Sequence, residues 1–106
     1  MHDLKWSNGE KKVAKALFET ALQRELQSYI QEFKDRAAKI ESPDDLWSIA
    51  KQASQKQREI DEKYDFRYSQ LIFLFANLLR GGSIQESELT ALGEEKAKYI
   101  IGIANL

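Results

Sequence analysis

Glu41-Ser42-Pro43-Asp44-Asp45 is the clearest helix boundary in the chain. Ser42 is a residue type favoured at a helix N-cap, and Pro43 follows at the first helical position, where its missing N–H costs nothing. Asp44 and Asp45 then place negative charge at the positive end of the helix dipole. The stretch therefore predicts that a second helix begins at Ser42 and that two long helices meet in a tight turn.

Before this turn, apolar residues recur in steps of three and four from about Asn8 to Ile40. Such spacing is typical of one stripe along a helix, and it approaches a heptad repeat from Leu22 onward. Ser7 or Asn8 can cap this first helix, and Glu10 adds negative charge to its first turn. The stripe consists of Val13, Leu17, Phe18, Ala21, Leu22, Leu26, Ile30, Phe33, Ala37 and Ile40.

After the turn, no glycine or further proline interrupts the chain from Pro43 to about Arg80, where Gly81-Gly82 follows. We expect one continuous helix of about 38 residues, roughly 57 Å long. Its middle, from Gln55 to Lys63, is polar apart from Ile60. Its end is so densely apolar that it needs burial on most sides: Tyr64, Leu71, Ile72, Phe73, Leu74, Phe75, Leu78 and Leu79.

Two short helices are expected beyond the double glycine. Ser83 and Glu86 match an S-x-x-E capping box, which predicts a short helix through Leu92. A last helix is expected from Glu94 to about Ala104. Both should fold back on residues 71–79 as a compact head.

The expected fold class is all-α, with one domain over residues 1–106: a long antiparallel hairpin, or stalk, at about 8–65, and a small C-terminal head at about 66–106. Two antiparallel helices bury only one seam between them, and the apolar stripe of this stalk is too wide for it. We therefore expect a second copy of the chain to complete a four-helix arrangement about a two-fold axis. The residues assigned to the wide stripe are Phe18, Leu22, Leu26, Phe33, Trp47 and Tyr64.

Composition excludes several classes of function. Lysine and arginine (16) nearly balance aspartate and glutamate (17), and neither sign forms one block, which argues against general nucleic-acid binding or docking on anionic lipid. The absence of cysteine excludes disulfides and thiolate metal sites and fits a cytoplasmic protein. No apolar run approaches the roughly 20 residues that span a bilayer, and the N-terminus lacks the apolar core of a signal peptide.

Catalytic and metal chemistry find little support. His2 is the only histidine, and no neighbouring residue could orient it. Asp61 and Asp65 share one helical face and could in principle bind a metal. The interleaved basic residues favour ordinary helix ion pairs instead, with Arg58 facing Glu62 and Glu59 facing Lys63. We expect no catalytic residue, no metal and no cofactor.

Two aromatic positions leave alternatives open. Trp47 is either a core tryptophan or an anchor in a protein interface, a role in which tryptophan is enriched. Phe73 and Phe75 point in different directions on one helix. Either both belong to the core of the head, or one stays at the surface as a contact.

Several segments, taken in order, carry a resemblance to a known family. They are Ala16-Leu17-Phe18, Arg24-Glu25-Leu26, Asp44-Asp45-Leu46-Trp47, Glu59-Ile60-Asp61-Glu62-Lys63-Tyr64-Asp65-Phe66-Arg67, Phe73-Leu74-Phe75-Ala76-Asn77-Leu78-Leu79 and Glu88-Leu89-Thr90-Ala91-Leu92. Over nearly its whole length, the chain resembles the fluorescence recovery proteins of cyanobacteria.

The resemblance implies an all-helical homodimer that binds photoactivated orange carotenoid protein, chiefly through that protein's C-terminal domain. Binding would speed the return to the inactive orange form and restore phycobilisome fluorescence, in the cytoplasm or at the periphery of thylakoid membranes. The resemblance links Trp47 to the dimer seam and to activity, with Asp44 and Leu46 beside it. It points to Phe73 as a partner contact, with Tyr64, Asp65 and Arg67 as further candidates.

The chain departs from the family pattern near the tryptophan. Well-known members carry a His-Asp pair three and four residues after it, where this chain has Ala50 and Lys51. They carry an arginine ten residues after it, where this chain has Gln57. The exchange of aspartate for lysine reverses a charge that a partner surface would meet. A divergent member with the same fold and another protein partner is therefore the main alternative, ahead of a structural spacer and an enzyme.

Overall fold

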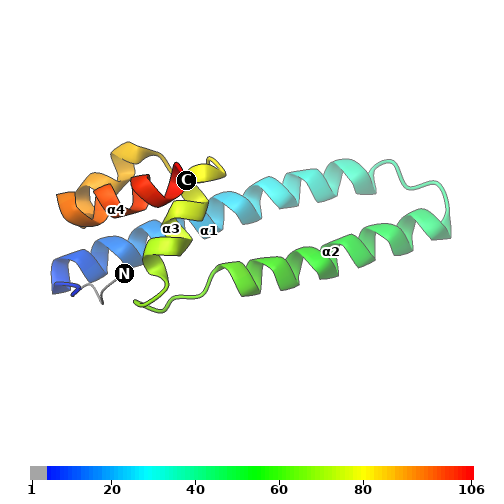
Figure 1. The fold of residues 1–106 in the computed structure, drawn as a ribbon. Coiled ribbons are helices and arrows are strands. Elements are labelled where there is room, and N and C mark those ends of the chain that lie inside the picture. Colours follow the sequence, from blue (N-terminus) through cyan, green and yellow to red (C-terminus); the bar gives the residue numbers. More distant parts are fainter. Residues whose placement is uncertain (1–4) are drawn as a thin grey trace.

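The computed structural model describes residues 5–106, so His2 lies outside the described part of the chain. The described residues form an all-helical body of 53 × 27 × 22 Å, as expected. Figure 1 shows a long hairpin with the remaining helices gathered along one half of it. The helices in chain order are α1 (Asn8–Ala37), α2 (Pro43–Lys63), α3 (Leu71–Arg80), the 3-10 helix η1 (Glu86–Leu92) and α4 (Glu94–Ala104).

The hairpin begins and turns where the sequence predicts. Ser7 caps α1 in a full capping box: its hydroxyl accepts from the Glu10 N–H at 3.1 Å, and its own N–H donates to the Glu10 carboxylate at 2.8 Å. Ser42 caps α2 by accepting from the Asp45 N–H at 3.2 Å, with Pro43 at the first position. The helix α1 ends at Ala37 rather than Ile40, since the next residues form the turn.

The prediction of one continuous helix from Pro43 to Arg80 is wrong. The helix α2 ends at Lys63 after 21 residues, and Tyr64 leaves helical geometry with φ −93° and ψ 70°. A linker of seven residues, 64–70, then leads to α3. In the linker, Tyr64, Phe66 and Tyr68 alternate with charged residues. This period of two is the side-chain spacing of non-helical, extended chain, and residues 64–67 are not helical.

The three linker rings pack on α1 and on the segment before it. The Phe18 ring lies edge-on to Tyr64 and Phe66, with centroids 5.4 and 5.0 Å apart. Tyr68 continues the contact, 5.5 Å from Phe66 and 5.9 Å from Trp6. We call these five residues the aromatic row. Edge-to-face pairs at these separations are favourable, so tertiary packing prevails over helix continuation here.

The core of the head is shared with α1. Ala14, Leu17, Phe18 and Ala21 of α1 are buried together with residues of α3, η1 and α4. Figure 1 shows α3 crossing α1 and α4 lying along the N-terminal half of α1. The expected fold-back of the short helices on α3 is therefore confirmed. The assignment of Phe18 and Tyr64 to a stripe open to a second copy is wrong, because Phe18 is buried and Tyr64 packs on it.

The capping box expected at Ser83 and Glu86 lies two residues further on. Gln85 is the N-cap of η1, and its N–H donates to the Glu88 carboxylate at 3.0 Å. Gly82 has a positive φ of 82°, a conformation that glycine adopts without strain. The turn around Gly82 is followed by the buried Ile84, and the helix can begin only after that side chain has entered the core.

Candidate protein-interaction site

Four large apolar side chains stand out from the stalk into solvent. Ile30 and Phe33 on α1 and Leu46 and Trp47 on α2 are between 38% and 67% exposed, with Trp47 the most exposed of the four. We call them the exposed stalk group. Large apolar residues gathered at a surface are typical of sites where another protein binds. Trp47 is therefore not a core residue of the single chain, and its interface role stays a prediction.

Helical spacing arranges these residues in two rows. On α1, the row Leu26, Ile30, Phe33 and Ala37 advances in steps of four, three and four; on α2, the row Leu46, Ala50, Ala53 and Gln57 does the same. Such steps keep side chains on one face of a helix and are typical of helices that pack along their length. Asp44, Ala50, Lys51 and Gln57, named from the resemblance, are all exposed.

Phe73 and Phe75 differ in burial, as in the alternative that leaves one ring at the surface. Phe75 is fully buried at the centre of the head, whereas Phe73 is 43% exposed on the same helix. The alternative that places both rings in the core is therefore wrong. Phe73 offers an apolar surface on the head, and its role as a contact stays a prediction.

The linker residues Asp65 and Arg67 pair with each other, Arg67 Nε donating to Asp65 Oδ2 at 2.7 Å, and their side chains are 41% and 65% exposed. Tyr64 is half-buried instead, and its hydroxyl donates to Glu25 at 2.7 Å. The structure thus gives Tyr64 a packing role, while Asp65 and Arg67 are accessible to a partner.

Glu25 ties three segments together. Its carboxylate also accepts from Lys63 Nζ at 2.5 Å and from the Ser83 hydroxyl at 3.4 Å. Lys63 therefore pairs with Glu25 of α1. The sequence had suggested a pair between Lys63 and Glu59 instead. Glu25 joins the end of α2, the linker and the turn before η1, a connection across about 60 positions of sequence that no local pattern shows.

These bonds shift two pKa values in opposite directions. Burial opposes ionisation of Glu25, but the hydrogen bonds from Lys63 and Tyr64 outweigh it and hold the pKa of Glu25 below its ordinary value. Burial, together with the hydrogen bond to the Glu25 carboxylate, raises the pKa of Tyr64. The ionised carboxylate and the neutral phenol are therefore the forms that the fold favours.

A pH titration should reveal this arrangement. Three carboxylates have a lowered pKa in the folded protein. Hydrogen bonds from Ser7 lower the pKa of Glu10, and a hydrogen bond from Arg24 lowers the pKa of Glu88. Lys63 and Tyr64 lower the pKa of Glu25 in the same way. A carboxylate whose pKa is lower in the folded than in the unfolded state stabilises the folded protein at pH values above its ordinary pKa of 4.5. This stabilisation is lost as the pH falls through the lowered pKa. We expect the free energy of unfolding to decrease between about pH 5 and about pH 3, measured by urea denaturation.

Glu25→Gln should lower the free energy of unfolding by about 2 kcal/mol at neutral pH, and its pH dependence should be shallower. Glu94→Gln is the matched control. The Glu94 side chain is 87% exposed, and its Oε1 lies 3.7 Å from Lys98 Nζ, so it forms only a surface ion pair. Equal pH profiles for the natural chain and for Glu25→Gln would contradict the assigned role of Glu25.

Two further ion pairs fasten the head to α1. Arg24 binds the Glu88 carboxylate through both terminal nitrogens at 2.8 Å and donates to the Ser83 carbonyl at 3.0 Å. Lys96, only 6% exposed, donates to the Lys5 carbonyl at 2.7 Å and to Glu10 at 3.1 Å. Sequence reasoning missed both, because each joins residues that lie more than 60 positions apart.

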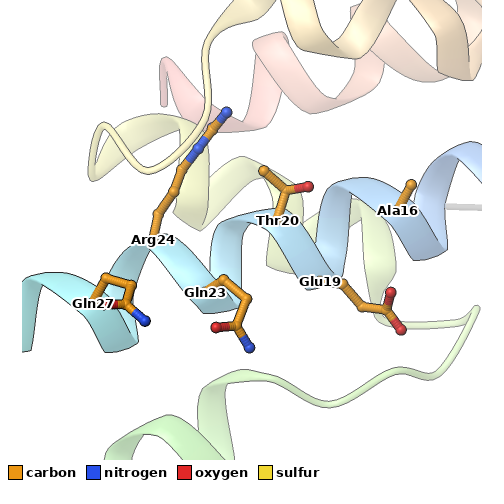
Figure 2. A pocket seen from close by; sticks show the side chains of 6 residues that line it. All are labelled: Ala16, Glu19, Thr20, Gln23, Arg24 and Gln27. Carbon is orange, nitrogen blue, oxygen red and sulfur yellow. The ribbon is translucent and has the colours of Figure 1, made fainter.

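A shallow groove runs along the outer side of α1 beside Arg24. Figure 2 shows Arg24 extending towards the turn before η1, while Gln23 and Gln27 point to the other side of the helix. The lining residues are Ala16, Glu19, Thr20, Gln23, Arg24 and Gln27. These side chains hold no nucleophile–base pair, and within residues 5–106 no group of three His, Cys, Asp or Glu side chains could hold a metal ion. None of the helices between residues 5 and 106 combines the length and the apolar character that a membrane span requires.

The fold and these surfaces define an all-helical hairpin-and-head protein. A family model described as the photoprotection regulator fluorescence recovery protein matches residues 6–104. The fluorescence recovery protein of Synechocystis sp. (strain ATCC 27184 / PCC 6803 / Kazusa) is 44% identical over 101 residues, 95% of this chain and 93% of that protein. The chain therefore belongs to the fluorescence recovery protein family.

Solved structures agree with this assignment. The fluorescence recovery protein of Fremyella diplosiphon superposes with a TM-score of 0.90 at 37% identity, covering 96% of this chain and 100% of that one. The Synechocystis sp. PCC 6803 structure superposes with a TM-score of 0.90 at 43% identity and the same coverage. The overall fold of this chain is thus that of the family.

Proposed function

We propose that this protein is a regulator that binds photoactivated orange carotenoid protein and accelerates its return to the inactive orange form. Quenching of the phycobilisome antenna then ends and antenna fluorescence recovers. The observation that carries the proposal is the family match over almost the entire chain. Such a regulator works in the cytoplasm, including the cytoplasmic surface of thylakoid membranes, and needs neither a cofactor nor covalent chemistry.

The regulator acts by shifting a population. A protein that binds the compact form of its partner, or the barrier state before it, more tightly than the open form moves the partner towards the compact form. The C-terminal domain of the carotenoid protein is the part that is bound. On this chain, Phe73 on the head makes the contact, supported by Asp65 and Arg67, whose side chains are accessible to solvent.

The active form in this proposal is a homodimer joined through the stalk. The rows that contain Ile30, Phe33 and Leu46 cover each other across a two-fold axis, and Trp47 lies at the edge of that contact. Burial of these side chains removes apolar surface from water at about 25 cal/mol per Å². The free energy gained by this burial would stabilise the dimer relative to the single chain, in which these side chains are exposed.

A second candidate, a family member with a different protein partner, is favoured by one observation. Ala50, Lys51 and Gln57 are exposed on α2, so a partner surface would meet them directly. They replace the His-Asp pair and the arginine of well-known members, and Lys51 reverses a charge. A complementary surface would then be repelled.

Sedimentation velocity with purified orange carotenoid protein, in the dark and under blue-green light, distinguishes the two candidates. The first predicts a complex with the illuminated form and less complex in the dark. Ala50→His/Lys51→Asp restores the family pair and serves as the reference variant. If the reference variant binds while the natural chain does not, the second candidate is correct. If neither binds, although both are folded, the carotenoid protein is not the partner.

A further inference from the structure

The N-terminal end of α1 carries an excess of positive charge. Residues 5–15 contain four lysines and one glutamate, although the whole chain has a net charge of −1. That glutamate, Glu10, is engaged by the buried Lys96 and by the N-cap, Ser7. It therefore does not neutralise the neighbouring lysines, and the surface beside the linker is basic.

The rings of the linker hold two of these lysines in place. Lys11 Nζ lies 5.2 Å from the centroid of the Tyr68 ring, and Lys15 Nζ lies 4.7 Å from that of Phe66. The two lysines are four positions apart and so share a face of α1. Cation–π contacts of this kind hold ammonium groups while leaving them charged and accessible. Less side-chain freedom is then lost when a ligand binds.

The carboxylates beside this surface do not cancel its charge. Glu19 is 3.6 Å from Lys15, but both side chains are more than half exposed, so the pair is weak. Asp65 is paired with Arg67. Lys12 is exposed beside them, and Tyr68 presents 41% of its surface to solvent. A partly exposed tyrosine suits a protein contact, and exposed lysines at the rim of such a contact attract an acidic partner.

We infer that Lys11, Lys12, Lys15 and Tyr68 form a docking surface for an acidic segment of the protein partner. We call it the basic patch. It rests on the proposed function, because the partner is the same carotenoid protein, but it is separate from Phe73 and from the exposed stalk group. A nucleic-acid backbone would need a longer basic stripe than these lysines provide. The basic patch speeds encounter by attraction and orients the partner before the apolar contacts form.

Lys11→Glu/Lys12→Glu tests the basic patch in the full chain. The readout is the initial rate at which substoichiometric protein accelerates dark relaxation of photoactivated orange carotenoid protein. We expect a rate about tenfold lower than that of the natural chain at about 20 mM NaCl, and a difference that shrinks at about 300 mM NaCl because salt screens exposed charges. Lys34→Glu/Lys39→Glu, which changes two exposed lysines at the other end of the stalk, should stay within about twofold. Circular dichroism establishes that every variant is folded.

The outcomes separate the two proposals. If the natural chain accelerates relaxation and both variants match it at low salt, the basic patch is overturned while the proposed function stands. If the natural chain gives no acceleration, the proposed function fails, and docking of that partner fails with it. If Lys11→Glu/Lys12→Glu loses only binding to phosphatidylserine vesicles or single-stranded DNA, the basic patch serves another ligand and the inference is wrong.

Discussion

Phe75→Ala is expected to lower the free energy of unfolding by about 3–5 kcal/mol, the usual cost of removing a buried phenylalanine. Phe75 is fully buried where α3 crosses α1, and its ring fills space among residues of α1, α3, η1 and α4. Its loss removes apolar burial and leaves a cavity. For a domain of this size, such a change is a large part of the total stability. Urea denaturation followed by circular dichroism at one fixed protein concentration measures it.

Phe73→Ala is the matched control, since it removes the same side chain two positions away in the same helix. Phe73 is 43% exposed, so we expect its loss to cost less than about 1 kcal/mol. The same variant should weaken binding of the partner, which Phe75→Ala affects only through folding. Equal losses of stability in the two variants would contradict the placement of the core.

Ile30→Asp/Phe33→Asp is expected to convert the proposed stalk dimer to a folded monomer. Both side chains lie in the exposed row of α1, and two carboxylates from each copy would meet across the proposed contact. Burying unpaired like charges costs several kcal/mol, enough to reduce dimer affinity by more than about 1,000-fold. Sedimentation equilibrium at micromolar concentration gives the mass directly.

Ser28→Asp/Gln31→Asp is the control for this prediction. It adds the same charge at two exposed positions of α1 that lie outside the row of Ile30 and Phe33. The control should remain a dimer. A natural chain that is a monomer at micromolar concentration would refute the stalk dimer, and so would dimers in both variants.

Local signals in the sequence predict the hairpin well. The turn at Ser42 and Pro43 and the cap at Ser7 depend only on residues within one helical turn, where side-chain and backbone chemistry decide the outcome. The fold-back of the short helices follows from the dense apolar end of the chain, which requires burial. These parts of the fold can be read from one sequence.

The break after Lys63 could not be predicted from helix signals. Neither glycine nor proline marks it, and the contacts of Tyr64 with Phe18 and of Tyr68 with Trp6 join residues distant in sequence. The alternation of aromatic residues at 64, 66 and 68 is the signal that was available. The same long-range packing buries Phe18 and so removes it from the exposed stripe.

The candidate site was predictable in part. The family resemblance pointed to Trp47 and Leu46 on the stalk, but only the packed head decides that Phe73 is exposed and Phe75 is buried. The links through Glu25 and Arg24 join segments distant in sequence. They depend on the way α1 and the head meet, which a single sequence does not encode in any local pattern.

Dark relaxation of photoactivated orange carotenoid protein, followed by visible absorbance with and without this chain, measures whether this protein regulates that partner. We expect a strong acceleration at substoichiometric amounts, because one regulator can act on many partner molecules in turn. That result would also establish that Ala50, Lys51 and Gln57 are compatible with activity. An unchanged relaxation rate, with the added protein folded and dimeric, would contradict the claim and assign this fold to another partner.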